Sequence, residues 1–282
     1  MTAVVTASRA RRVVPADAIH LLAGAALLAA INGVSATIFG SFAGFGWRGA
    51  LLDLSGVSAV FWFALYAIFM LVRGEAPRAA PRRGDLWIAA IVVGLALWPS
   101  ARAAAIGVLI SAVYLARRPG DDPRAVPMSV VLFALSGMLV AGPVLIALAG
   151  PYLLSLDAHF VGWLADVAAT GTTVRFAGDQ DVFTIGVPCS SIHNVSLAVI
   201  LWASLTQLLG FRVTPRLIAL CGAAMAAMIV VNGLRLAAIA HYRGSFDWLH
   251  DGLGAQLFGW ASLAAAGLVI GVGLVAMRDD RS

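Results

Sequence analysis

Charged residues are scarce in this sequence, and lysine is absent from it altogether. Asp, Glu, Lys and Arg make up 12% of the 282 residues, whereas a soluble domain carries roughly 25%. Hydrophobic residues make up 61%, and the mean hydropathy is +0.93. This balance excludes an ordinary soluble domain and predicts a polytopic membrane protein whose partner is the lipid bilayer.

Arginine supplies all 19 basic side chains, and the net charge is +5. The arginines lie in short clusters between apolar runs, as topology signals do. A nucleic-acid surface would need a basic stripe interleaved with polar or aromatic residues, and the sequence has none. We therefore expect no nucleic-acid partner.

Cysteine is nearly absent, with two residues in the chain. Cys221 lies in the middle of an apolar run, whereas Cys189 lies at the start of the preceding one. A disulfide between them is disfavoured by this difference in depth, so Cys189 is expected to be a free thiol. The histidines His193, His241 and His250 lack a metal-ligand spacing, and no glycine loop for phosphate is present. We expect no metal and no cofactor.

The apolar runs predict an all-α bundle of about eight transmembrane helices with a small extracytoplasmic insertion. Two short runs on either side of Pro99-Ser100 are expected to form a tight helical hairpin. The chain divides into about five N-terminal spans (1–150), an interfacial segment (151–188) and a core of about three spans (189–282). The eight runs cover approximately 16–39, 57–72, 86–98, 103–116, 128–149, 191–209, 216–240 and 253–277.

The segment 151–188 differs from the spans around it. Apolar residues recur at helical spacing from Leu153 to Val167, interrupted by Asp157, His159 and Asp166, which is typical of an amphipathic helix at the membrane surface. Two short strand-like runs then flank Ala177–Asp181. They predict a small hairpin of residues 173–176 and 182–185.

The distribution of arginine predicts the topology. If the N-terminus is cytoplasmic and eight spans alternate, fourteen arginines lie at inside ends and only five elsewhere, as the positive-inside rule requires. Both termini are then cytoplasmic, and Cys189 and His250 face the outside. The fourteen are Arg9, Arg11, Arg12, Arg73, Arg78, Arg82, Arg83, Arg117, Arg118, Arg124, Arg212, Arg216, Arg278 and Arg281.

Three chemically distinctive side chains converge on this outer layer. Cys189 follows Pro188 at the start of a span, and His250 opens the last span. Arg235 lies six residues before His241, about 9 Å below the surface at 1.5 Å per residue, which is within reach of a long side chain. Charged groups in a membrane are costly and are kept for a reason.

These residue types suit acyl transfer by a thiol. Cys189 at a helix start is expected to have a lowered pKa and to act as the nucleophile. His250 would be the general acid and base, and Arg235 would stabilise the oxyanion. Asn232 lies one helical turn before Arg235 and could orient it, while Asp247 and Asp251 could fix the tautomer of His250.

Each residue also has an ordinary structural interpretation. A lone cysteine near a span end is often an inert thiol, a lone arginine there an anchor, and a lone histidine an interfacial side chain. His159, His193 and His241 are further candidates for the base. The joint placement of Cys189, Arg235 and His250 is what favours an active site.

The motifs around these residues resemble the exosortase/archaeosortase family of membrane transpeptidases. That family has a Cys-Ser-Gly-hydrophobic motif, then Asn-x-x-Arg, then a histidine motif that opens the next span. The corresponding segments are Cys189-Ser190-Ser191-Ile192, Asn232-Gly233-Leu234-Arg235 and His250-Asp251-Gly252-Leu253-Gly254, followed by Phe258. The resemblance covers about residues 184–260, and Ser191 replaces the usual glycine.

The resemblance implies that Cys189 is the nucleophile, Arg235 the transition-state stabiliser and His250 the acid and base. The implied substrates are secreted proteins with a C-terminal sorting signal of Pro-Glu-Pro type, a transmembrane helix and a basic tail. The enzyme would cut near the motif and transfer the protein to an unidentified surface acceptor. The implied location is the bacterial inner membrane, with the site facing outward.

Three other functions remain open from the sequence. A transporter or channel would use Arg235 as an anion site. A serine protease of the membrane would use Ser190 or Ser191, but no Gly-x-Ser-x-Gly segment surrounds them. A non-catalytic assembly subunit would keep the spans alone.

Overall fold

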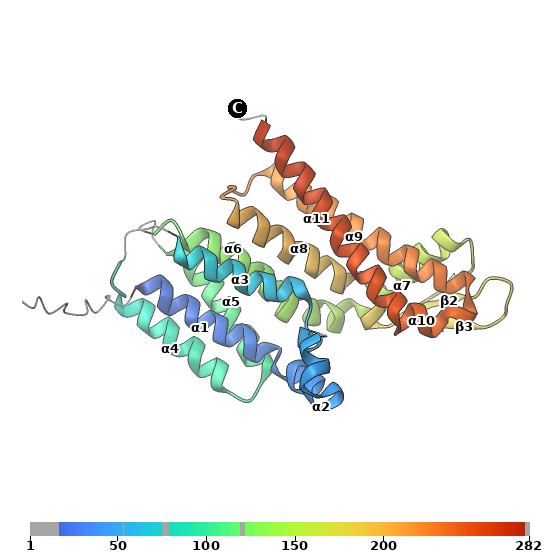
Figure 1. The fold of residues 1–282 in the computed structure, drawn as a ribbon, viewed down its shortest axis with the longest axis horizontal. Helices are drawn as coiled ribbons and strands as arrows, with labels where there is room; N and C mark the ends of the chain where they lie inside the picture. The colour runs from blue at the N-terminus through green and yellow to red at the C-terminus, as the bar shows by residue number, and fades with distance from the viewer. Residues whose placement is uncertain (1–16, 53, 75–78, 119–121, 280–282) are drawn as a thin grey trace, which may run out of the picture.

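The computed structural model describes residues 17–52, 54–74, 79–118 and 122–279. Within these ranges the chain is all-α except for one small sheet (Figure 1). The predicted N-terminal arginine cluster, Arg78 and Arg281 lie outside the described residues.

The first apolar run forms two helices instead of one. Helix α1 spans Ala18–Gly33, and the side chain of Asp17 caps it by accepting a hydrogen bond from the Ile19 amide. Helix α2 spans Ser35–Leu52 and is bent by 49° from α1. The predicted span 16–39 therefore breaks next to Gly33, where glycine weakens a helix.

Three further helices and a short turn continue the N-terminal half. The 3₁₀ turn η1 covers Leu54–Gly56, and α3 covers Ala59–Arg73 after a cap by Ser58. Helices α4 (Arg83–Leu97) and α5 (Ala101–Arg117) pack against each other as the predicted helical hairpin.

The next helical run continues past the predicted start of the interfacial segment. Helix α6 (Ala125–Ser136), the π-helical turn η2 (Gly137–Ala141) and α7 (Gly142–Ala165) form one run of 41 residues. The boundary predicted between residues 150 and 151 falls inside α7. Pro151 removes only one backbone hydrogen bond and lies on an exposed face, so the helix continues through it.

The predicted hairpin is confirmed. Strand β2 (Thr173–Arg175) pairs antiparallel with β3 (Val182–Thr184), with Val174 opposite Phe183. A third short strand, β1 (Ala169–Thr170), pairs with the other edge of β2. Val174 and Phe183 are buried on the same face, because residues directly opposite in a ladder point the same way.

The C-terminal third holds three long helices. The elements in order are the 3₁₀ turn η3 (Val187–Cys189), α8 (Ser191–Leu208), α9 (Pro215–His241), the 3₁₀ turn η4 (Arg243–Ser245), α10 (Phe246–His250) and α11 (Leu253–Asp279). Thr214 caps α9 by accepting from the Leu217 amide, and Pro215 occupies the first helical position, where its missing N–H costs nothing.

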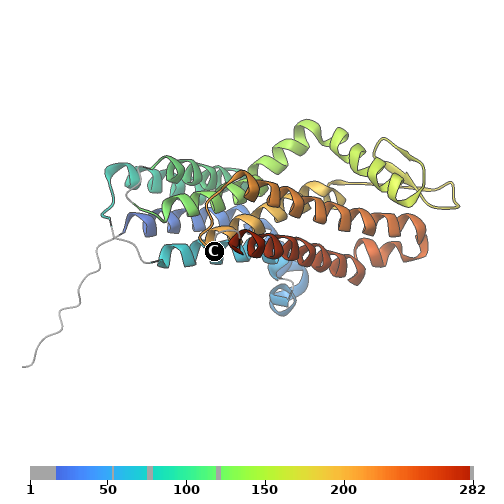
Figure 2. The same cartoon turned by 90° about the horizontal axis from the view of Figure 1, so that it is seen from above.

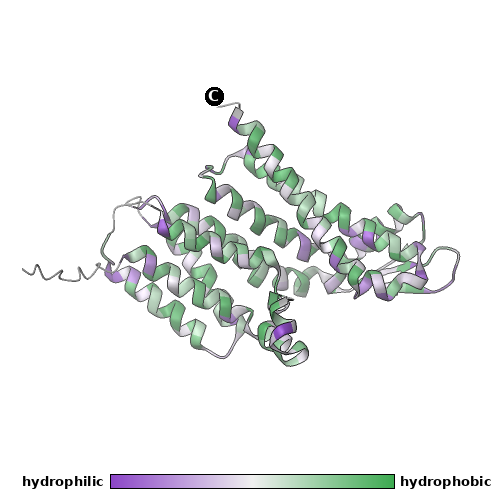
Figure 3. Cartoon of the chain, in the orientation of Figure 1, coloured by the Kyte–Doolittle hydropathy of each residue, from purple (hydrophilic) through white to green (hydrophobic). Residues whose placement is uncertain are grey.

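Among the described residues, four helical runs are long and apolar enough to cross a membrane. They are Ala125–Ala165, Ser191–Leu208, Pro215–His241 and Leu253–Arg278, and the bent pair α1–α2 would make a fifth. Helices α3, α4 and α5 have only 15, 15 and 17 residues. Most residues along the helices are hydrophobic (Figure 3). The chain therefore has the helices of a membrane protein.

Buried side chains form two separate hydrophobic clusters. The larger one joins α1, α3, α4, α5 and α6 to α8, α9 and α11. The smaller one joins the second half of α7, the sheet, α10 and the end of α9, and it includes Cys189. Helix α7 and the sheet lie beside α9 on the side away from α11 (Figure 2).

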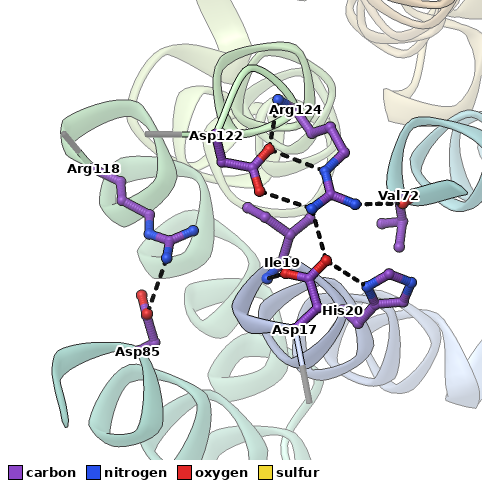
Figure 4. A network of polar contacts seen from close by, with 8 residues as sticks. All are labelled: Asp17, Ile19, His20, Val72, Asp85, Arg118, Asp122 and Arg124. Carbon is purple, nitrogen blue, oxygen red and sulfur yellow. Dashed lines mark hydrogen bonds and ion pairs between the residues drawn. The ribbon is translucent and has the colours of Figure 1, made fainter. Parts of the chain in front are cut away.

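A network of buried ion pairs closes one end of the larger cluster (Figure 4). Arg124 binds Asp17 at 2.7 Å and Asp122 at 2.8 Å, and it also donates to the Val72 carbonyl. These three charged side chains are at most 7% exposed. The network therefore joins the ends of α1, α3 and α6.

A third buried carboxylate forms an ion pair at the same end. Asp85 accepts hydrogen bonds from Arg118 at 3.1 Å, from the Tyr114 hydroxyl at 2.9 Å and from the Arg82 amide. Its side chain is fully buried. The contacts fix the open end of the α4–α5 hairpin.

Candidate active site

Cys189 lies just before helix α8. It is the last residue of η3, and its own amide donates to the Gly186 carbonyl at 3.0 Å. Helix α8 begins two residues later, at Ser191. Cys189 therefore precedes the helix that it was expected to open, and the free amides of the first turn belong to the residues after it.

A carboxylate from α7 occupies the start of α8. Asp157 accepts a hydrogen bond from the Ser191 amide at 2.9 Å and another from the Ser191 hydroxyl. A negative charge at a helix N-terminus is stabilised by the helix dipole. Asp157, rather than the Cys189 thiolate, is thus the anion that this helix start holds.

His250 reaches the thiol from the last residue of α10. Its Nε2 lies 3.2 Å from Cys189 Sγ, across 61 residues of sequence. A separation of this size allows the thiol to donate its proton to the imidazole. The structure thus brings together the two residues that the sequence assigned to nucleophile and base.

The orientation of His250 comes from stacking. The Phe246 ring lies one helical turn earlier, with ring centroids 4.9 Å apart and planes at 11°. His250 Nδ1 is 2.8 Å from an Asp251 oxygen, an ion-pair distance, but it has no hydrogen-bond partner with suitable geometry. The Asp251 side chain is 82% exposed, so its hold on the ring is weak and Phe246 sets the ring plane.

The stack continues into the sheet. Phe246 makes edge contacts with Phe176 and Phe183, at centroid distances of 6.3 and 6.4 Å. Arg243 lies over Phe176 and pairs with Asp179 and Asp181 in the β2–β3 loop. The hairpin therefore supports the ring that orients His250.

Asn232 acts on Cys189 instead of on Arg235. Its side-chain amide donates to the Cys189 carbonyl at 2.9 Å in a buried position. The expectation that it orients Arg235 has no contact to support it among the described residues. Gly233 between them allows α7 to approach α9, because a Cβ there would lie 2.5 Å from the Phe160 ring.

Burial raises the pKa of the Cys189 thiol, and the nearby Asp251 carboxylate adds to this effect. The Arg235 guanidinium acts in the opposite direction through its charge and a side-chain hydrogen bond. The lowered pKa expected from the sequence is therefore wrong, because burial outweighs the cation. A thiol of this kind is protonated at neutral pH and needs a base at the moment of attack.

Three polar atoms of the site are buried without a hydrogen-bond partner. They are Ser190 Oγ, Arg235 Nε and His250 Nδ1. Ser190 is 1% exposed and does not cap α8. Unpaired buried polar atoms are costly and are tolerated chiefly where a ligand completes them.

The other predicted candidates lie apart from the thiol. Asp247 is exposed, and its side chain makes no hydrogen bond or ion pair with His250 among the described residues. His159 binds the Ser155 carbonyl, His241 is exposed at the end of α9, and His193 faces a cavity described below.

Cys221 is a free, buried thiol in α9. In the described part of the chain, no three His, Cys, Asp or Glu side chains are placed to hold a metal ion.

Sequence reasoning missed two residues of the site. Asp157 was noted only as an interruption in an apolar pattern. Phe246 carries a detectable signal, since residues four apart on a helix are neighbours, and it lies four residues before His250. No signal in the sequence pairs Asp157 with Ser191.

A cavity of about 640 Å³ begins at Pro188, the residue before Cys189. It lies between α8, α9, α11 and the connection from α2 to α3. Pro188, Asn232 and Arg235 form the wall nearest Cys189. Neither Cys189 nor His250 lines it.

The arrangement is suited to acyl transfer. The thiol has a base 3.2 Å away, a guanidinium beside it and a cavity on the guanidinium side. These are the groups that a nucleophile, a proton acceptor and an oxyanion require.

Comparison of the chain with protein-family models, with curated proteins and with solved structures finds no match in any of the three.

Proposed function

We propose that this protein is a membrane cysteine transpeptidase that resembles the exosortases. It cleaves a C-terminal sorting signal of Pro-Glu-Pro type from secreted proteins and transfers them to a surface acceptor. The observation that carries the proposal is the 3.2 Å contact between Cys189 Sγ and His250 Nε2, with Arg235 beside the thiol.

The first half-reaction forms a thioester. His250 Nε2 takes the proton of Cys189 as Sγ attacks the carbonyl carbon of the substrate, and Arg235 stabilises the resulting oxyanion. The intermediate then collapses, the C–N bond breaks, and the leaving amine receives the proton from Nε2. The N-terminal part of the substrate remains as a thioester on Cys189.

The second half-reaction releases the product. A nucleophile of the acceptor gives its proton to the neutral His250 and attacks the thioester carbon, and Cys189 Sγ leaves and regains a proton. Water in place of the acceptor would give hydrolysis.

The proposed topology has eight membrane-crossing segments, with both termini cytoplasmic and the thiol at the outer face of the inner membrane. In support, the arginine-rich ends of α3, α5 and α6 lie together at one end of the bundle (Figure 1). The sheet and α10 lie at the other end. The positive-inside rule assigns the first end to the cytoplasm.

A polar cavity inside a helical bundle also favours a second candidate, an anion transporter with Arg235 as its site. The substitution Arg235→Lys separates the two. Lysine keeps the positive charge, so a transporter should retain part of its uptake. A transpeptidase should lose most of its activity, because lysine lacks the planar paired donors that bind an oxyanion.

The test follows processing in cells. Wild type, Cys189→Ala and the matched control Cys221→Ala are expressed with a co-encoded secreted protein that carries a Pro-Glu-Pro-type tail. We expect the tail to be removed by the wild type and the control, and to remain in Cys189→Ala at equal membrane levels. Equal processing by all three would refute the thiol mechanism.

A further inference from the structure

The cavity beside Cys189 has a polar lining that the catalytic contacts do not use. Besides Arg235 and Asn232, it is lined by His193 and Asn194 from the first turn of α8 and by Gln256 from the first turn of α11. The residues come from α8, α9 and α11, which are separate in the sequence and adjacent in the fold.

Several of these side chains lack partners. Among the described residues, His193, Asn194 and Gln256 make no side-chain hydrogen bond, and Arg235 Nε is buried without one. By contrast, Asn232 binds the Cys189 carbonyl and Ser262 binds the Phe258 carbonyl in the same region. His193 and Gln256 are exposed and Asn194 is partly buried, so their polar groups are accessible to a ligand in the cavity.

The chemistry of the set identifies the class of ligand. Carboxamides offer both donors and acceptors, which match the alternating N–H and C=O groups of an extended peptide. The guanidinium adds donors for carbonyl oxygens. The volume of about 640 Å³ is within the usual range for a ligand pocket.

The position of His250 identifies which part of the peptide enters. A leaving amine takes its proton from the acid, so the leaving group must depart toward His250. Neither Cys189 nor His250 lines the cavity, but three residues next to Cys189 do: Pro188 precedes it, Asn232 binds its carbonyl, and Arg235 lies beside its thiol. The acyl part, which stays bonded to Sγ, therefore extends into the cavity.

We propose that this cavity is the acyl-side subsite and binds the backbone of the segment that precedes the cleaved bond, through Asn194 and Gln256. The assignment rests on the proposed function. A second groove of about 750 Å³ lies across α8, lined by Ser191, Ile192 and Val195 and by small residues of η2 and α7. It is almost entirely apolar and could not satisfy a peptide backbone.

The test uses two peptide probes that alkylate a thiol from opposite sides. In a tripeptidyl chloromethyl ketone the peptide lies on the acyl side, and in an iodoacetylated tripeptide amide it lies on the leaving-group side. Both are applied to the full-length protein in detergent, in a Cys221→Ala background, and labelling of Cys189 is followed by intact mass.

We expect Asn194→Ala combined with Gln256→Ala to slow labelling by the chloromethyl ketone about tenfold, as one or two lost hydrogen bonds imply. Labelling by the iodoacetylated peptide should not change, which also shows that the site is folded. The control Gln180→Ala, exposed in the β2–β3 loop, should affect neither probe.

A second variant tests the cavity without removing a polar group. Gly259 lines the cavity, and a Cβ there meets no atom within 4 Å. Gly259→Leu should therefore fill space in the cavity and slow only the chloromethyl ketone.

Equal effects on both probes, or no effect on the chloromethyl ketone, would overturn the assignment. This failure is distinct from failure of the proposed function, in which Cys189→Ala would still process the secreted protein in cells.

Discussion

The two ends of this bundle both hold ionisable side chains, but they pair them differently. At the end that holds Arg124, the guanidinium makes three hydrogen bonds to Asp122 and Asp17 and one to the Val72 carbonyl. At the end that holds Cys189, Arg235 and His250 are only partly buried, and each has one buried nitrogen without a hydrogen-bond partner. The end that holds Arg124 (the paired end) therefore has a structural role, whereas the end that holds Cys189 (the open end) has the unpaired polar atoms of a candidate active site.

The pKa directions repeat this contrast. Burial raises the pKa of Asp122, but hydrogen bonds from Arg124 outweigh it and the net pKa is lowered. Burial also raises the pKa of Cys189, and Arg235 does not outweigh it. The carboxylates of the paired end thus stay charged at neutral pH, whereas the site holds a neutral thiol that ionises only when a base accepts its proton.

The largest expected effect is at the paired end. Arg124→Gln leaves two buried carboxylates without their cation and should cost about 3–5 kcal/mol of stability. Thermal unfolding in detergent measures the loss, and Arg102→Gln serves as control because that side chain is exposed and has no ion pair among the described residues. Equal melting temperatures for Arg124→Gln and Arg102→Gln would show that the ion pairs of Arg124 do not stabilise the fold.

The matching substitution at the open end should act on rate instead. Arg235→Lys keeps the charge but loses the planar donors, and processing should fall about 100-fold or more with unchanged melting temperature. Arg175→Lys, an exposed arginine in β2, is the control and should process normally. A variant that melts early would show that Arg235 is structural too.

Acid should distinguish the ends as well. The folded pKa values of Asp17 and Asp122 are lowered, so their contribution to stability is present above the unfolded value near 3.8 and is lost as pH falls through the folded values. Unfolding monitored below pH 4 should therefore be steeper in the wild type than in Asp17→Asn combined with Asp122→Asn. Parallel curves would contradict this.

The smallest expected effect concerns the support of His250. Phe246→Leu removes a ring stack of about 0.5–1.5 kcal/mol, and it should lower the rate of Cys189 alkylation severalfold and change its pH profile. Phe246→Tyr keeps the ring and should restore both. An unchanged pH profile in Phe246→Leu would show that the function of His250 does not depend on stacking against Phe246.

The sequence predicted the parts of this site that membrane physics constrains. Cys189 and His250 open different apolar runs on the same side, so a shared layer follows from span counting. The contact of Asn232 with the Cys189 carbonyl could not be predicted, because helical periodicity shows which face of a helix a residue lies on and not which residue it touches. The contact of Asp157 with Ser191 depends on α7 continuing through Pro151, which local preferences argue against.

The most direct test of the open end compares alkylation of Cys189 by iodoacetamide in the wild type and in His250→Gln, both with Cys221→Ala. At neutral pH the thiol is protonated, so its reaction depends on the imidazole. The account predicts that His250→Gln slows labelling by at least about tenfold at pH 7 and that the difference disappears at high pH, where the thiol ionises unaided. Equal rates at pH 7 would contradict a functional Cys189–His250 pair.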